Sequence, residues 1–125
     1  MRIFIFFGSV LAALAVSAGA IGAHLLEGKL SPQLLDTFRM AANYQLVHAI
    51  GLIVVGLMGT GNRNGFIRLA GWLLLLGIVL FSGCLFAWTL TEVRFFVHLV
   101  PIGGTAFIAG WIALAVAACL QPKEN

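Results

Sequence analysis

The chain has 125 residues, of which 62% are hydrophobic and 9% are charged, and its formal net charge is +3. Its mean hydropathy is +1.09. This composition excludes an ordinary soluble globular protein, and the length leaves room for a single domain, residues 1–125. The small positive charge is explained by orientation in a membrane, so a nucleic-acid partner is not expected.

Charged residues are confined to short segments that separate four long apolar stretches. Each stretch holds the roughly 20 apolar residues that cross a hydrocarbon core about 30 Å thick. The expected spans are 3–25, 40–60, 66–90 and 97–119. Runs such as WLLLLGIVLF lack the alternating pattern of a transmembrane β-barrel. The sequence therefore predicts an all-α membrane protein with four transmembrane helices in an antiparallel bundle.

The first stretch has a second interpretation as a cleavable signal peptide, because Arg2, an apolar run and the small residues SAGA follow one another. The same stretch carries a stripe of small residues along one helix face, at Gly8, Ala12, Ala15, Gly19 and Gly22. A packed membrane helix uses such a stripe to bring two backbones together. We therefore expect this stretch to remain as the first span.

The segment before the second span predicts an amphipathic extension of that helix. Ser31 is a natural N-cap, and Pro32 suits the first helical position. The apolar residues that follow fall on one face: Leu34, Leu35, Phe38 and Ala42. A helix that begins at Pro32 is longer than the core is thick, so its first residues should lie on or lean out of the outer membrane surface.

The distribution of Lys and Arg predicts the orientation. An even number of spans places both termini on one side, which carries Arg2, Arg63, Arg68 and Lys123. The opposite side carries Lys29, Arg39 and Arg94. Because cytoplasmic segments are enriched in Lys and Arg, both termini are expected in the cytoplasm.

Polar side chains lie at the start of the second span: Asn43, Tyr44, Gln45 and His48. Residues 46–59 extend only about 21 Å, so the span must reach back to about residue 40. Polar groups that face lipid are costly, so these side chains should point into the bundle. Ser82 of the third span lies at nearly the same depth, which predicts a hydrogen bond between His48 and Ser82.

Four segments occur in order along the chain: GAIGAHLL, NYQLVHAIGL, FSGCLFAW and PIGGTAFIAGW. In these segments the chain resembles the small bacterial membrane proteins of domain-of-unknown-function family 423, which has eukaryotic relatives. The resemblance implies a four-helix protein of the bacterial inner membrane and brings no activity. The family pattern falls on Gly22, Ala23 and His24, on Tyr44, Gln45 and His48, on Phe81 to Leu85, and on Pro101, Gly103 and Gly104. Cys84 departs from the pattern, which usually has serine there.

Three histidines, His24, His48 and His98, raise the question of a metal or haem site. Helix geometry places His24 and His98 about 31 Å above the cytoplasmic ends of their helices, and His48 about 18 Å. His24 and His98 alone would make a weak two-ligand site. No metal or cofactor is therefore expected, and the outer rim of the bundle should hold His24, His98, Pro101, Gly103 and Gly104.

Catalytic chemistry has little support in the sequence. Ser82 and His48 supply two of the three groups of a nucleophilic triad, but all four acidic residues lie outside the spans. GTGNRNG lacks the features of a phosphate-binding loop. No catalytic residue is assigned, and an intramembrane enzyme is a remote alternative.

The last span also carries small residues at helical spacing: Gly103, Ala106, Gly110, Ala113 and Ala117. This pattern favours close helix contact over the close approach of a ligand. Pro101 is expected near the start of that helix.

Two classes of function follow from these observations. The first is an accessory or structural membrane protein, whose polar residues bond helices together and whose partners are lipids, a second copy or another membrane protein. The alternative is a binding or transport protein, in which Asn43, Tyr44, His48 and Ser82 line an outer-facing polar pocket for a small amphipathic molecule or ion. The classes differ in whether the face of His48 meets a packed helix or a cavity.

Overall fold

A computed structural model describes residues 1–120, and these residues form helices without a strand. Four helical runs are long and apolar enough to cross a membrane. They are α1 (Arg2–His24), α2 (Pro32–Met58), the run Gly65–Thr91 and α5 (Phe95–Cys119). The third run consists of α3 (Gly65–Gly77), the π-helix η1 (Ile78–Gly83) and α4 (Cys84–Thr91). The predicted all-α membrane class is confirmed.

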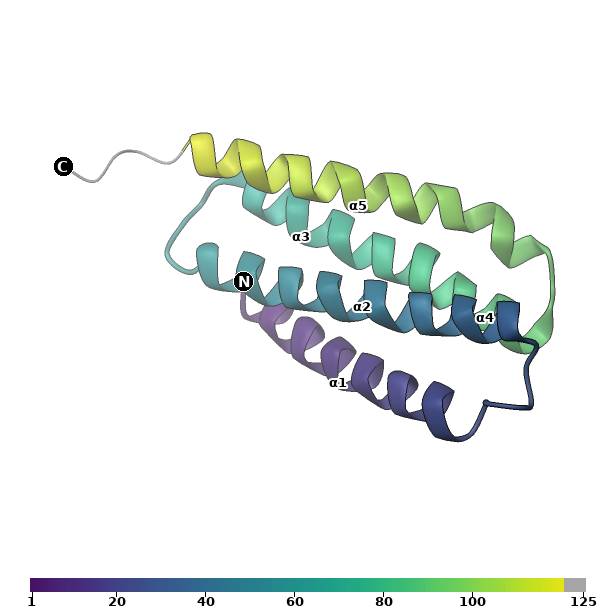
Figure 1. The fold of residues 1–125 in the computed structure, drawn as a ribbon. Coiled ribbons are helices and arrows are strands. Elements are labelled where there is room, and N and C mark those ends of the chain that lie inside the picture. Colours follow the sequence, from purple (N-terminus) through teal and green to yellow (C-terminus); the bar gives the residue numbers. More distant parts are fainter. Residues whose placement is uncertain (121–125) are drawn as a thin grey trace.

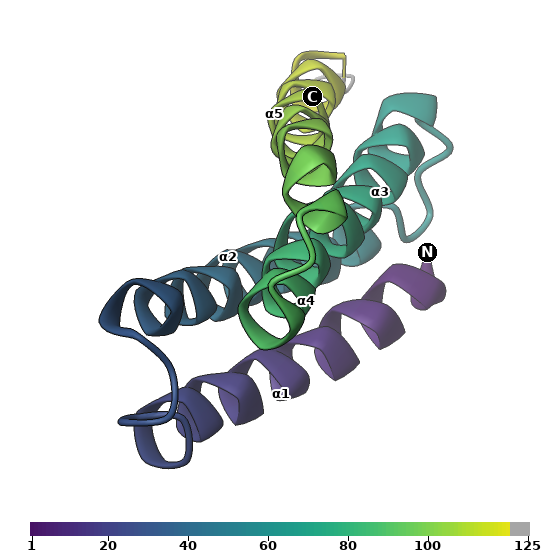
Figure 2. The same cartoon turned by 90° about the vertical axis from the view of Figure 1, so that its right-hand side faces the viewer.

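The four runs alternate in direction, and each packs mainly against its neighbours in the sequence (Figure 1). α1 packs on α2, α2 packs on α3, η1 and α4, and α5 packs on α3 and η1. An end-on view shows α1 and α5 on opposite sides, with α2 and the third run between them (Figure 2). The N-terminus and the C-terminal end of α5 lie at the same end of the molecule.

The predicted extension is the first part of α2, continuous with the span. Ser31 caps the helix, because its Oγ accepts a hydrogen bond from the Leu34 N–H at 3.3 Å. Leu35 and Phe38 are buried, and the Phe38 ring meets the Phe86 ring of α4 edge to face with centroids 4.9 Å apart. The extension therefore packs against α4, the last segment of the third run.

Pro101 lies deeper in its helix than expected. α5 begins at Phe95, so Pro101 occupies the interior of the helix, where its missing N–H removes the donor that would bond the Val97 carbonyl. The expectation that Pro101 stands near the helix start is corrected, because the helix begins at Phe95, earlier than the expected span 97–119.

The stripes of small residues are used inside the chain. A Cβ built on Gly8 would lie 2.7 Å from the Ala49 carbonyl oxygen of α2, and one on Gly22 would lie 3.1 Å from the Phe38 ring. Gly19 is the exception, with nothing within 4 Å. These glycines therefore bring α1 and α2 together, as small residues do between membrane helices.

The contact between α5 and the π-helix depends on Gly103. A Cβ at this position would collide with the backbone of Leu80 and Phe81, whereas one on Gly104 would meet only the Phe81 side chain at 3.7 Å. The π-helix thus presents its backbone to α5 at the point where α5 has no side chain. This contact joins the segments FSGCLFAW and PIGGTAFIAGW, two of the four that carry the resemblance.

The two adjacent glycines provide a test of this contact. Gly103→Ala should lower the free energy of unfolding by about 1 to 3 kcal/mol, because a backbone cannot move aside as a side chain can. Gly104→Ala should leave it unchanged or raise it by up to about 1 kcal/mol through helix propensity. Circular dichroism during SDS-induced unfolding measures both. Equal curves for the two variants would contradict the proposed contact.

Candidate functional site

The polar residues of α2 do not form one cluster. Gln45 and His48 are buried, with 7% and 6% of their surface exposed, whereas Asn43 and Tyr44 are exposed. The expectation that all of them point into the bundle is therefore wrong for Asn43 and only partly met by Tyr44. Their spacing explains the difference, because consecutive helix positions point in different directions.

Gln45 connects α2 to α1. Its Nε2 donates a hydrogen bond to the backbone carbonyl of Leu11 at 2.8 Å. That carbonyl lies in the interior of α1, so the bond ties the middle of one span to its neighbour. Such interhelical bonds are worth about 0.6 kcal/mol on average in a membrane protein.

His48 has a different partner from the predicted one. Its Nδ1 lies 2.6 Å from the carbonyl oxygen of Tyr44, one turn earlier in the same helix. Because a carbonyl oxygen only accepts, Nδ1 donates the proton in this bond. The predicted hydrogen bond between His48 and Ser82 is wrong, because the Ser82 hydroxyl has no hydrogen-bond partner among the described residues. The Tyr44 carbonyl bonds Nδ1 instead, and a phenylalanine covers one face of the ring.

That phenylalanine belongs to an aromatic cluster across three helical segments. The His48 ring stacks on Phe107 of α5, with centroids 3.4 Å apart and planes 12° apart. Trp111 lies one turn further along α5, and its ring centroid is 6.0 Å from that of His48. The Tyr44 ring lies 4.7 Å from Phe81 of η1. One face of the His48 ring therefore packs against α5.

Sequence reasoning missed Phe107 and Trp111. The signal was their spacing of four residues, which matches the spacing of Tyr44 and His48 on α2. The glycine and alanine residues of PIGGTAFIAGW gave the stronger signal, which indicated close helix contact.

Ser82 lies in the π-helix and is fully buried, with 0% of its surface exposed. Its hydroxyl has no hydrogen-bond partner among the residues that the structure describes. Ser17, Thr37 and Thr105, by contrast, each donate to the carbonyl four residues earlier. A buried hydroxyl without a partner is costly in an apolar medium, and π-helices are frequent at functional sites.

Of the predicted outer-rim residues, His24 lies on α1, whereas His98, Pro101, Gly103 and Gly104 lie on α5. His24 ends α1 and His98 lies near the start of α5, and both are exposed. His98 lines a hollow of about 250 Å³ with Trp88, Arg94 and Val97. Within residues 1–120, no three His, Cys, Asp or Glu side chains are grouped to hold a metal ion.

A second hollow lies beside the aromatic cluster. It measures about 190 Å³ and is lined by Asn43, Tyr44, Val47 and His48, all from α2. The hydroxyl of Tyr44 and the amide of Asn43 form no hydrogen bond with any residue in the described range 1–120. The hollow is the place where an outside molecule would meet the polar residues of α2.

Comparison with known proteins identifies the family. The model of the family described as "Protein of unknown function (DUF423)" matches residues 18–104. The chain belongs to this family. A UPF0382 membrane protein of Staphylococcus haemolyticus is 45% identical over 117 residues, which are 93% of this chain and 94% of the relative. The UPF0382 membrane protein YwdK of Bacillus subtilis is 42% identical over 119 residues, 94% of this chain and 97% of the relative.

These names describe membrane proteins and state no activity. The resemblance drawn from the four ordered segments is confirmed, and so is the description as an integral membrane protein. No solved structure matches the chain.

In this DUF423 chain, the bond from Gln45 to Leu11 predicts a measurable loss of stability. Gln45→Leu replaces the amide by an apolar side chain of similar size and so removes the donor. It should lower the free energy of unfolding by about 0.6 kcal/mol, and by no more than about 2 kcal/mol. Asn43→Leu is the matched control, since Asn43 is exposed and should not lose stability. SDS-induced unfolding measures the stability of both variants. A larger loss of stability for Asn43→Leu than for Gln45→Leu would argue against the assigned roles.

Proposed function

We propose that the chain is an accessory, structural component of the bacterial inner membrane, in which the polar residues of the spans hold the helices together. The observation that carries this proposal is the packing of His48, which stacks on Phe107 and bonds to its own backbone. The bond from Gln45 to the Leu11 carbonyl supports it by joining α2 to α1. The proposed partners are the surrounding lipids and a second copy of the chain or another membrane protein.

A binding function is the second candidate, and a specific observation favours it. The buried Ser82 hydroxyl has no partner among the described residues, and the exposed Tyr44 and Asn43 line a hollow. In this alternative, a small amphipathic molecule with hydrogen-bonding groups supplies partners for Tyr44 and Asn43 from the outer side, whereas the fully buried Ser82 does not line the hollow.

Substitutions of His48 separate the two functions. His48→Phe keeps an aromatic ring against Phe107 and should keep most of the stability, whereas His48→Ala leaves a cavity and should lose about 2 kcal/mol or more. If the role is structural, His48→Phe should also complement a strain that lacks the gene. The measurements are a thermal melt in detergent and the growth of the complemented strain.

Tyr44→Phe and Asn43→Leu complete this test, because both remove groups that face the hollow and neither removes a bond between helices. Under the structural proposal both variants melt and complement as the wild type does. A variant that melts normally but fails to complement would overturn the structural proposal and favour the binding function.

We further propose that both termini lie in the cytoplasm. The support is the count of Lys and Arg in the links, together with the position of both ends of the described chain at one end of the bundle. Residues 33 and 63 lie in or beside links at opposite ends of α2.

Cysteine labelling tests this orientation. In a background with Cys119→Ser, Gln33→Cys should react with a membrane-impermeant maleimide added to intact cells, and Arg63→Cys should react only after the membrane is opened. The reverse pattern would show that the termini lie outside.

A further inference from the structure

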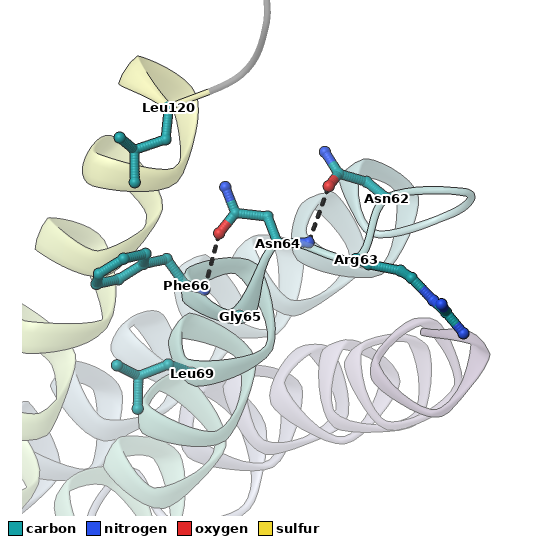
Figure 3. A pocket seen from close by; sticks show the side chains of 7 residues that line it. All are labelled: Asn62, Arg63, Asn64, Gly65, Phe66, Leu69 and Leu120. Atoms are coloured by element: carbon teal, nitrogen blue, oxygen red, sulfur yellow. Dashed lines mark hydrogen bonds between the residues drawn. The ribbon is translucent and has the colours of Figure 1, made fainter.

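A hollow of about 670 Å³ lies at the end of the bundle where α3 begins and α5 ends (Figure 3). One edge is polar and is formed by Asn62, Arg63 and Asn64 of the link before α3. The opposite wall is apolar and is formed by Phe66, Leu69 and Leu120. The hollow thus crosses the boundary between a polar link and the start of a membrane span.

The polar edge is ordered by its own hydrogen bonds. The Oδ1 of Asn62 accepts from the Asn64 N–H, and the Oδ1 of Asn64 accepts from the Phe66 N–H, both at 2.9 Å (Figure 3). The Nδ2 of Asn64 donates to the Ala117 carbonyl of α5 at 3.3 Å. Both amide oxygens are therefore occupied within the link. The Nδ2 of Asn62 and the guanidinium of Arg63 are the donors at this edge that form no hydrogen bond with any of residues 1–120.

Charge at this end of the molecule favours an anion. Arg63 forms no ion pair with any of residues 1–120, and Arg2 and Arg68 lie at the same end. The acidic side chains of the described chain belong to the other end: Glu27, Asp36 and Glu92. Within residues 1–120, a negatively charged acceptor therefore meets no competing carboxylate at this end.

The apolar wall indicates a second property of the ligand, a hydrocarbon part. Phe66, Leu69 and Leu120 are 41%, 48% and 59% exposed although they are large and apolar. The Arg63 side chain extends from the link away from this wall (Figure 3). A molecule that satisfies both sides is elongated, with an anionic end and a hydrocarbon end.

We propose that this hollow binds one anionic phospholipid of the surrounding membrane. Its phosphate accepts hydrogen bonds from Asn62 and Arg63, and an acyl chain lies along Phe66, Leu69 and Leu120. Arg63 is the residue that discriminates between headgroups, because it supplies charge, and the apolar wall holds the chain of any phospholipid. This site is independent of His48 and of the structural role proposed above.

Native mass spectrometry of the full chain, purified in detergent, tests the proposal by counting retained lipids. Phosphatidylglycerol and phosphatidylcholine with identical chains are the two probes. The wild type should retain phosphatidylglycerol preferentially. Arg63→Gln should reduce that retention about fivefold, the amount that one Lys or Arg contributes near an anionic surface. It should reduce retention of phosphatidylcholine by a smaller factor, because the choline cation offsets the charge of the same phosphate group. Arg63→Lys keeps the charge and should retain more than half of the preference.

Arg68→Gln is the matched control for charge, since Arg68 is exposed at the same end of α3 but does not line the hollow. It should change retention less than twofold. Equal losses for Arg63→Gln and Arg68→Gln would mean general attraction to a basic surface and would overturn the site.

Leu69→Ala and Leu76→Ala are the matched pair for the acyl chain. Both leucines lie on α3 with similar exposure, 48% and 45%, but only Leu69 lines the hollow. Leu69→Ala should weaken retention of both lipids, and Leu76→Ala should not. Soluble glycerol phosphate is the remaining arm. If it displaces phosphatidylglycerol at equal concentration, the ligand is a free anion and the lipid proposal fails.

Discussion

The contact between α5 and the backbone of the π-helix is the constraint on which the candidate site depends. Gly103 lets α5 approach the chain at Phe81, and the neighbouring contacts follow in antiparallel order, with Phe107 over Gly77 and Gly110 beside Leu74. Phe107 of α5 thus meets a glycine of α3, and Leu74 of α3 meets a glycine of α5. This alternation fixes the height of Phe107, and hence the surface on which the His48 ring stacks. A shift of α5 by one residue would place a side chain against a backbone and remove the stack.

Hydrogen bonding in an apolar medium explains how the polar residues are used. Lipid offers no partners, so a polar side chain must find one in the protein, and a backbone carbonyl already bonded in a helix has a second lone pair to offer. Gln45 uses a carbonyl of α1 and His48 uses a carbonyl of its own helix. Because both acceptors are backbone carbonyls, neither bond depends on which side chains other helices present. Among the buried polar side chains of the described residues, Ser82 is the exception, and it lies in the helix segment whose hydrogen-bond pattern differs.

The sequence was sufficient for the fold class, the number of spans and the Ser31 cap, because these depend on hydropathy and local chemistry. It did not reveal which face of each helix points into the bundle. Hydropathy does not distinguish a residue that faces lipid from one that faces another helix, so Asn43 and Gln45 were expected on the same side although they lie on different ones. The π-helix was also missed, since an apolar run such as LGIVLF carries no mark of one additional residue in a turn. Without it, the depth of Ser82 predicted a bond to His48 that the structure does not contain.

The use of the small residues inside the chain constrains how a partner can bind. Gly8, Gly22 and Gly56 lie between α1 and α2, and Gly103 and Gly110 lie between α5 and the third run. None of these positions is available for the close backbone contact that such stripes provide between separate chains. The outer face of α1 instead carries large apolar side chains, Ile3, Phe6, Val10, Leu14 and Ile21. In lipid such a face gains little by leaving one hydrocarbon environment for another, so a specific partner needs polar contacts, and those lie at the ends of the helices, where charged links meet the membrane surface.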